Sequence, residues 1–230
     1  WKRGGHAFLG TFSDLLQNPE ANEHVAEFVR GKIDEVVKDP VTAERLKPRG
    51  YPIFARRPCL DTSYYETFNE PHVHLVDCLE ETITGVSERG VVTDAREYPL
   101  DALILATGYD GLTGAMLAID VVGRNGSSLR EKWRDGPRSY LGLVVAGFPN
   151  MFMICGANGP AALANIITLN EQNVAWVCEL ITYMGDNGLR SVEAQVDAEN
   201  EWMELVSSLA DKTLLLRASP WSTGPNSERK

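Results

Sequence analysis

The chain has 230 residues, of which 43% are hydrophobic and 23% are charged, and its formal net charge is −10. This composition excludes a disordered chain and supplies enough apolar side chains for one or two packed cores. The excess of acidic residues repels phosphate backbones and anionic lipid headgroups. No uninterrupted apolar run is long enough to cross a bilayer. We therefore expect no nucleic-acid partner and no membrane partner.

Cysteine and histidine spacing gives little support for a metal or redox centre. The four cysteines lie far apart, at Cys59, Cys78, Cys155 and Cys178. None forms a C-x-x-C pair, which argues against a zinc knuckle or a dithiol motif. His72 and His74 share one face of an expected strand, but no third ligand lies nearby, so we expect polar strand residues and no metal. Free thiols suit a reducing compartment, and we expect a cytoplasmic protein.

The N-terminal part of the chain is predicted to be helical over residues 14–48. An Asn-Pro-Glu helix start at Asn18 is followed by apolar residues at helical spacing. The Asp-Pro pair at Asp39 interrupts this pattern, and a second helix is expected over 41–46. The proline- and arginine-rich stretch 51–60 is predicted to be an ordered loop.

Short apolar runs predict strands in the middle of the chain. Runs at 73–76 and 90–92 are expected on either side of a turn. The run at 101–106 is almost continuously apolar, which is typical of a strand buried on both faces of a parallel sheet. Runs at 144–146 and 151–155 have the same character.

The last third of the chain adds long helices. Residues 165–185 form an apolar stripe at helical spacing, and residues 192–215 predict a strand followed by a long helix. The tail 219–230 is polar and is expected to be loose. Strands mixed with helices in this way predict an α/β fold.

The most specific motif is DALILATGYD at 101–110. It resembles the apolar strand and Ala-Thr-Gly signature of flavoproteins with two dinucleotide-binding domains, where the chain passes from the nicotinamide domain to the flavin domain. Small residues allow close approach of the backbone to a ligand. The resemblance implies cofactor contacts at Thr107, Gly108 and Tyr109. On the motif alone, an ordinary buried strand followed by a turn is the alternative.

A second motif, YLGLVVAGFPNMFMICGANGP, occupies residues 140–160. It resembles the segment of Baeyer–Villiger monooxygenases that ends in a glycine-rich loop near the flavin ring. The resemblance implies that Gly156, Asn158 and Gly159 line the flavin. Taken alone, such a loop is an ordinary turn in most proteins.

A third motif, FARRPCLD at 54–61, resembles the Lys-Arg-Pro loop of the same family. The resemblance implies that Arg57 is the catalytic arginine, which stabilises the negative charge on the oxygenated flavin. It also implies that Arg56 reads the 2′-phosphate of NADPH and that Asp61 is a cofactor contact. Arginine suits both tasks because its planar, charged fork pairs with oxyanions. The family has Lys where Arg56 stands, and two surface arginines are the alternative reading.

Two further stretches extend the resemblance to most of the chain. The sequence WSTGPN at 221–226 resembles the family's Trp-x-x-Gly-Ala-Asn loop, so Trp221 is expected near the nicotinamide ribose. Pro225 replaces the family's Ala there. The residues after the glycine-rich loop, Ala161, Ala162 and Leu163, are expected to form a small, apolar lining of the substrate pocket.

The family's flavin-binding motif is missing. It has the form G-x-G-x-x-G after a first strand, because glycines seat the pyrophosphate on a helix N-terminus. The nearest match, at 108–114, has the wrong spacing. We expect a partial two-dinucleotide-binding-domain flavoprotein with Rossmann-like parallel sheets, lacking its N-terminal FAD-binding part. Residues 1–106 would be the C-terminal part of the NADPH-binding domain, with a helical insertion at about 12–48, and 107–230 the C-terminal part of the FAD-binding domain.

The implied reaction is insertion of an oxygen atom from O2 next to a ketone carbonyl, giving an ester or lactone, with FAD and NADPH as cofactors. The isolated chain is expected to be inactive. One alternative is a non-catalytic chain that pairs with a partner, such as the missing N-terminal half. Another is an N- or S-oxidising flavin monooxygenase, although the Arg-Arg-Pro loop together with Gly-Phe-Pro-Asn favours the Baeyer–Villiger reading.

Overall fold

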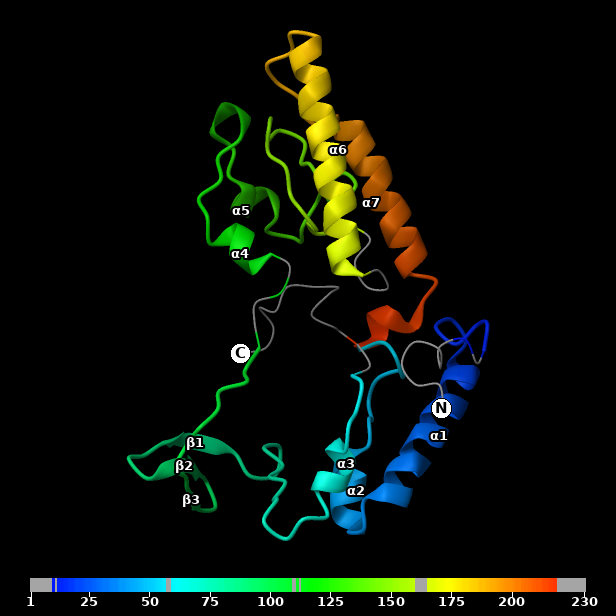
Figure 1. Ribbon diagram of the computed structural model, residues 1–230, viewed down its shortest axis with the longest axis vertical. Helices are drawn as coiled ribbons and strands as arrows, with labels where there is room; N and C mark the ends of the chain where they lie inside the picture. The colour runs from blue at the N-terminus through cyan, green and yellow to red at the C-terminus, as the bar shows by residue number, and fades with distance from the viewer. Residues whose placement is uncertain are drawn as a thin grey trace. The chain divides into compact units, whose positions relative to one another are not determined.

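The computed structural model describes residues 10, 12–56, 59–108, 111, 113–159 and 165–218. The chain divides into two compact units, Trp1–Gly108 and Tyr109–Lys230. Each unit has its own secondary structure (Figure 1). Each also has its own cluster of buried side chains.

The first unit begins with the two predicted helices, α1 (Pro19–Val36) and α2 (Pro40–Leu46). The side chain of Asn18 accepts hydrogen bonds from the first turn of α1, and that of Asp39 accepts one from the first turn of α2. Each cap satisfies backbone N–H groups that have no partner within the helix. Both predicted helix starts are therefore confirmed.

The two helices share a small core of Ile33, Val37 and Ala43. Arg30 lies beside it and is only 7% exposed. Its guanidinium is paired with Glu23 and Glu27, each at 2.5 Å, and Nε donates to the carbonyl of Pro48 at 3.1 Å. These contacts compensate the cost of burying the charge.

A three-stranded antiparallel sheet completes the regular structure of this unit. Its strands, in spatial order, are β1 (Ile83–Val86), β2 (Gly90–Thr93) and β3 (Glu97–Pro99). The predicted strand at 90–92 is β2. Gly90 has a φ of +156°, and a side chain there would meet the carbonyl oxygen of Tyr98 at 1.9 Å, so only glycine fits. A short helix, α3 (Tyr64–Thr67), precedes the sheet.

The second unit is mainly helical and irregular. Its helices are α4 (Gly114–Leu117), α5 (Leu129–Lys132), α6 (Ile166–Asp186) and α7 (Val196–Ala210), with 3-10 turns at Arg124–Gly126 and Leu214–Ala218. The predicted helices over 165–185 and within 192–215 correspond to α6 and α7. One core cluster contains Leu129, Trp133, Val145, Phe148 and Met153, and another contains Leu143, Val144, Ala146 and Ala194.

Several predicted strands are absent from the described part of the chain. The runs at 73–76, 101–106 and 151–155 lie in irregular backbone, as does the start of 192–215. The run at 144–146 provides only an isolated bridge between Tyr140 and Val144. A strand forms only where a neighbouring strand binds its backbone groups, and the described residues supply no such neighbour for these runs.

Candidate functional site

The arginine loop of the first unit is held against α1 by Asn22. This side chain is 3% exposed, and its Nδ2 donates to the carbonyls of Leu15 and Ile53, each at 3.0 Å. Its Oδ1 accepts from the Ile53 backbone at 2.9 Å. A single buried amide thus fixes the start of the loop that carries Arg56.

Arg56 lies exposed at the end of this anchored loop. Its guanidinium carbon lies 4.2 Å from the centre of the Tyr51 ring, a cation–π contact that restricts the side chain while leaving its N–H groups available. This arrangement suits recognition of an anion. The predicted catalytic residue, Arg57, lies outside the described residues.

Asp61 has a local structural role. Its Oδ1 accepts a hydrogen bond from the Tyr64 backbone at 2.5 Å, at the start of α3. The residue before the helix, Ser63, has a left-handed φ of +62°. The described hydrogen bond of the Asp61 carboxylate therefore stabilises the turn that leads into α3.

The glycine-rich loop of the second unit is packed against backbone. A side chain at Gly142 would meet the Cα of Gly159 at 2.5 Å and its nitrogen at 2.7 Å. A side chain at Gly156 would meet the carbonyl oxygen of Gly142 at 2.4 Å. The Gly156 backbone also donates to that carbonyl at 3.1 Å. Glycine is thus required at these positions so that the segments around 142 and 156–159 can touch.

Side chains from two other segments hold the loop residues Ala157 and Asn158. Ser139, which is fully buried, donates to the carbonyl of Ala157 at 2.6 Å. Asn158 Nδ2 donates to the carbonyl of Pro137 at 2.7 Å, and Trp202 of α7 donates to the carbonyl of Asn158 at 3.1 Å. The side-chain amide of Asn158 therefore makes a hydrogen bond within the protein. The backbone of Asn158 has a left-handed φ of +65°, which marks a constrained turn.

A buried carboxylate on α7, Glu199, fixes the same region. It is 2% exposed, and its Oε2 accepts from the Ala146 backbone at 2.7 Å. Its Oε1 lies 2.9 Å from Lys132 Nζ and 3.5 Å from Arg138 Nε. Glu199 thereby connects α7, α5 and the segment that leads into the glycine-rich loop.

Thr107 and Gly108 lie at the end of the extended segment that closes the first unit. Gly108 has a left-handed φ of +84°, and no atom of the described residues lies within 4 Å of the place where a side chain would be. Glycine is thus favoured here by backbone conformation.

The structure describes only part of the predicted site. Gly156, Asn158 and Gly159 come together in the second unit, whereas Arg56, Asp61, Thr107 and Gly108 belong to the first. The remaining predicted residues, Tyr109, Ala161, Ala162, Leu163 and Trp221, lie outside the described residues.

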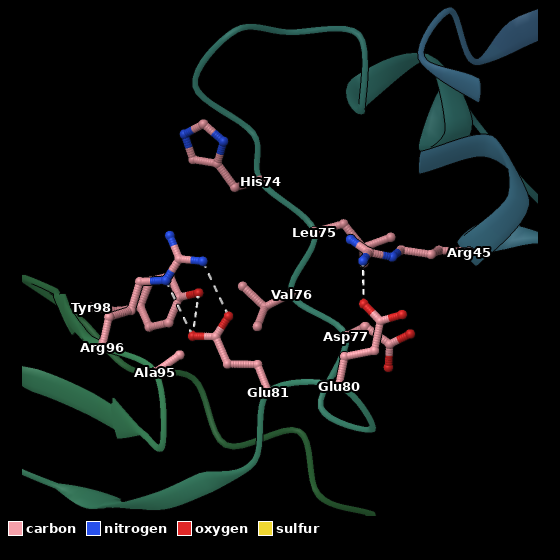
Figure 2. Close-up of a pocket in the computed structure, with 10 residues that line it drawn as sticks. All are labelled: Arg45, His74, Leu75, Val76, Asp77, Glu80, Glu81, Ala95, Arg96 and Tyr98. Carbon is pink, nitrogen blue, oxygen red and sulfur yellow. Dashed lines mark hydrogen bonds and ion pairs between the residues drawn. The ribbon is translucent and has the colours of Figure 1, made fainter. Parts of the chain in front are cut away.

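A cavity of about 560 Å³ lies in the first unit, and none of its lining residues is a predicted site residue (Figure 2). Glu81 dominates its chemistry, since its Oε1 accepts from Thr93 at 2.7 Å and from Tyr98 at 2.8 Å. These hydrogen bonds, assisted by Arg96, lower the pKa of Glu81 below its ordinary value of 4.5. Figure 2 shows Arg45 paired with Glu80 on the other side of residues 74–77. Charges of both signs line the cavity and are mostly paired, which indicates a structural role.

Among the described residues, no three His, Cys, Asp or Glu side chains group closely enough to hold a metal ion. His72 and His74 lie in irregular backbone, so the strand face expected for them is not formed. None of the described helices is long and apolar enough to span a membrane.

Sequence reasoning missed the residues that hold the site. Asn22, Ser139 and Glu199 gave no signal of their role, because each acts through a contact distant in sequence. Tyr51 lies only five residues before Arg56, but no motif marks its ring as the partner of that guanidinium. Trp202 was expected only as part of the apolar stripe of a helix. Its indole N–H, pointing at a loop more than forty residues earlier, could not be inferred from periodicity.

Comparisons with known proteins agree with the motifs. No family model matches the chain. Cyclohexanone 1,2-monooxygenase of Acinetobacter sp is 38% identical over 229 residues, covering 98% of this chain and 41% of that protein. Phenazine N-monooxygenase PhzNO1 of Lysobacter antibioticus is 39% identical over 229 residues, covering 98% and 42%. A crystal structure of OTEMO in complex with FAD and NADP has a TM-score of 0.88 at 42% identity, covering 91% of this chain and 40% of that one.

The proteins to which the chain is similar are monooxygenases, and one of them was solved with FAD and NADP bound. Within this class, the chain is related over most of its length to proteins named Baeyer–Villiger monooxygenases, which confirms the family resemblance. The chain spans only about 40% of the length of the relatives it matches.

Proposed function

We propose that the chain is the C-terminal portion of an FAD- and NADPH-dependent Baeyer–Villiger monooxygenase, inactive by itself. The whole protein would insert an oxygen atom from O2 next to a ketone carbonyl and form an ester or lactone. The observation that carries this proposal is similarity over 98% of the chain to a cyclohexanone monooxygenase, with the three motifs in place.

The described residues fit a bound flavin in part. The left-handed backbone of Gly108, which carries no side chain, would allow a cofactor to approach closely. The smallness of Gly156 and Gly159 is explained by packing against Gly142 and needs no ligand. From the family resemblance we assign Thr107, Gly108 and Tyr109 to flavin contacts, and Gly156, Asn158 and Gly159 likewise.

When bound, FAD reduced by NADPH would supply the activation of O2. The chain's own residues would bind and orient the reactants. Arg56, restricted by Tyr51, would pair with the 2′-phosphate of NADPH, and Arg57 would stabilise negative charge at the reacting centre. Trp221 would contact the nicotinamide ribose, and the residues at 161–163 would line the ketone pocket. Asp61 would position the arginine loop through its turn.

The rest of the proposed protein would complete both domains. We assign 1–106 to the NADPH-binding domain, with the helices within 12–48 as its insertion, and 107–230 to the FAD-binding domain. Rossmann-like parallel sheets would form when the missing N-terminal half supplies their other strands. The wide spacing of the four cysteines, with no C-x-x-C pair, suits a cytoplasmic location.

Reconstitution tests this proposal. The part of the Acinetobacter relative that this chain does not cover would be produced as a second polypeptide and mixed with the chain, FAD and NADPH. We expect cyclohexanone to be converted to its lactone by the mixture and by neither polypeptide alone. Arg57→Ala should abolish the product while FAD stays bound. Activity in either polypeptide alone, or retained activity in the Arg57 variant, would contradict the proposal.

N-oxidation is the second candidate, favoured by the equally similar relative named phenazine N-monooxygenase. Assaying the same mixture with phenazine and with cyclohexanone separates the two reactions. The other alternative is a non-catalytic chain that only pairs with a partner. It predicts a stable complex in which no substrate is oxidised.

A further inference from the structure

Trp202 of α7 uses its polar atom to hold the glycine-rich loop. Its indole Nε1 donates to the carbonyl of Asn158 at 3.1 Å. The ring also packs against the ring of Tyr140 in a T-shaped contact, with the two centroids 6.4 Å apart. This ring contact orients the indole, so that its N–H keeps one acceptor on the loop.

The helix that carries Trp202 is itself attached to the segment that leads into the loop. One turn before Trp202, the Glu199 carboxylate accepts a hydrogen bond from the Ala146 backbone at 2.7 Å. The next residue, Asn200, accepts a hydrogen bond from the Arg138 guanidinium at 2.7 Å. Helix residues three apart lie on the same face, so Glu199 and Trp202 both reach toward this part of the unit. The helix is therefore a fixed support for the loop.

The backbone around the loop has conformations that need such support. Leu141 and Asn158 have positive φ values of +58° and +65°. Residues with a side chain rarely adopt this conformation, and it persists where surrounding contacts determine it. The other described hydrogen bonds of residues 156–159 stay within 137–159, whereas that of Trp202 comes from a separate helix. Trp202 thus fixes the loop relative to the rest of the unit.

We propose that Trp202 is a positioning residue of the monooxygenase, whose indole N–H fixes the Asn158 carbonyl and so sets the place of the loop 156–159 beside the flavin and the ketone. This inference rests on the proposed function, in which the loop contacts the flavin and residues 161–163 line the ketone pocket. Trp202 acts through the loop. Its loss should therefore affect how well the pocket is formed before the ketone binds more than it affects the chemical step.

The test uses the chain mixed with FAD, NADPH and the part of the Acinetobacter relative that this chain does not cover. Trp202→Phe removes the indole donor and keeps an aromatic ring. A tryptophan analogue with sulfur in place of the indole N–H, introduced at position 202, removes the donor with little change of shape. Trp133→Phe is the matched control, because the Trp133 indole also donates to a backbone carbonyl, that of Arg138, at 2.8 Å. Unfolding curves followed by circular dichroism show whether each variant is folded.

We expect both changes at position 202 to raise the KM for cyclohexanone by about fivefold, while kcat and the Kd of NADPH change by less than about twofold. A fivefold change corresponds to about 1 kcal/mol, the usual net contribution of one hydrogen bond. The visible absorption band of the bound flavin should also shift in both. Trp133→Phe should lower the free energy of unfolding and leave the KM and the absorption band unchanged.

An unchanged KM in the sulfur analogue would overturn the inference even if its stability falls, because the hydrogen bond would then serve folding alone. An equal rise of KM in Trp133→Phe would overturn it too, since the effect would follow stability and not the loop. In both cases the proposed function stands, because the wild-type mixture forms the lactone. If Trp202→Phe does not fold, the analogue decides. If the wild-type mixture forms no lactone, the proposed function fails and this inference fails with it.

Discussion

Replacing Gly142 by alanine tests whether the glycine-rich loop depends on backbone contact. Gly142 has a φ of +72°, and its added Cβ would lie 2.5 Å from the Cα of Gly159. A left-handed conformation costs a non-glycine residue roughly 1–2 kcal/mol. Relieving the overlap adds roughly 1–3 kcal/mol, as in other overpacked sites. The variant should therefore lose roughly 2–5 kcal/mol of unfolding free energy.

Gly147→Ala separates the two contributions. Gly147 also has a positive φ, +86°, but no atom lies within 4 Å of its Cβ position. Only the conformational cost applies there. The extra loss in Gly142→Ala measures the contact with Gly159.

Urea denaturation followed by tryptophan fluorescence provides the assay. Four of the five tryptophans, Trp133, Trp176, Trp202 and Trp221, belong to the second unit, so most of the signal follows the unit that carries the loop. Hydrogen exchange at 156–159 should also accelerate in Gly142→Ala. Equal destabilisation in the two alanine variants would refute the reasoning, because the contact would then contribute nothing.

Other predictions concern buried charge, acid stability and cofactor choice. Glu199→Ala leaves the buried N–H of Ala146 without its acceptor and removes the carboxylate paired with Lys132, which keeps its hydrogen bond to the Ala146 carbonyl; it should cost about 3 kcal/mol in urea denaturation, with a smaller loss for Gln. The surface variant Glu131→Gln should change stability by less than about 0.5 kcal/mol, and equal effects at the two sites would contradict the buried network. The pKa of Glu81 is lowered in the fold, so its contribution is present above pH 4.5 and is lost as the pH falls through the lowered value. Denaturation at several pH values should show Glu81→Gln differing from the wild type at pH 7 and converging with it in acid; a constant difference would contradict this. In the reconstituted complex, Tyr51→Leu should reduce the preference for NADPH over NADH by roughly two- to fivefold, and Tyr51→Phe should not, as measured by the two Kd values. Equal preference in both variants would exclude a role for the stacking contact.

The helices could be predicted from the sequence because their signals are local. Asn18 and Asp39 cap their helices within three residues, and the apolar periodicity of α6 and α7 belongs to single segments. Strand prediction succeeded only for β2, which pairs with close neighbours in the chain. The run at 101–106 has strand composition but no described neighbour, so composition alone could not determine its structure.

The chemistry of the candidate site could be predicted better than its geometry. The motifs identified the family, which the comparisons confirm. Asn158 donates a hydrogen bond to the carbonyl of Pro137, and Asp61 accepts one from the Tyr64 backbone in a turn. No sequence motif predicts either contact. The roles of Arg56 and Arg57 stay predictions, because they depend on ligands and because Arg57 lies outside the described residues.

The intact mass of the native species tests the central claim most directly. An antibody to this chain would capture the protein from its natural source, and mass spectrometry and visible absorption would follow. We predict a polypeptide or complex at least about twice the 25.4 kDa of this chain, carrying bound flavin. A species of 25.4 kDa with no companion chain and no flavin would contradict the account.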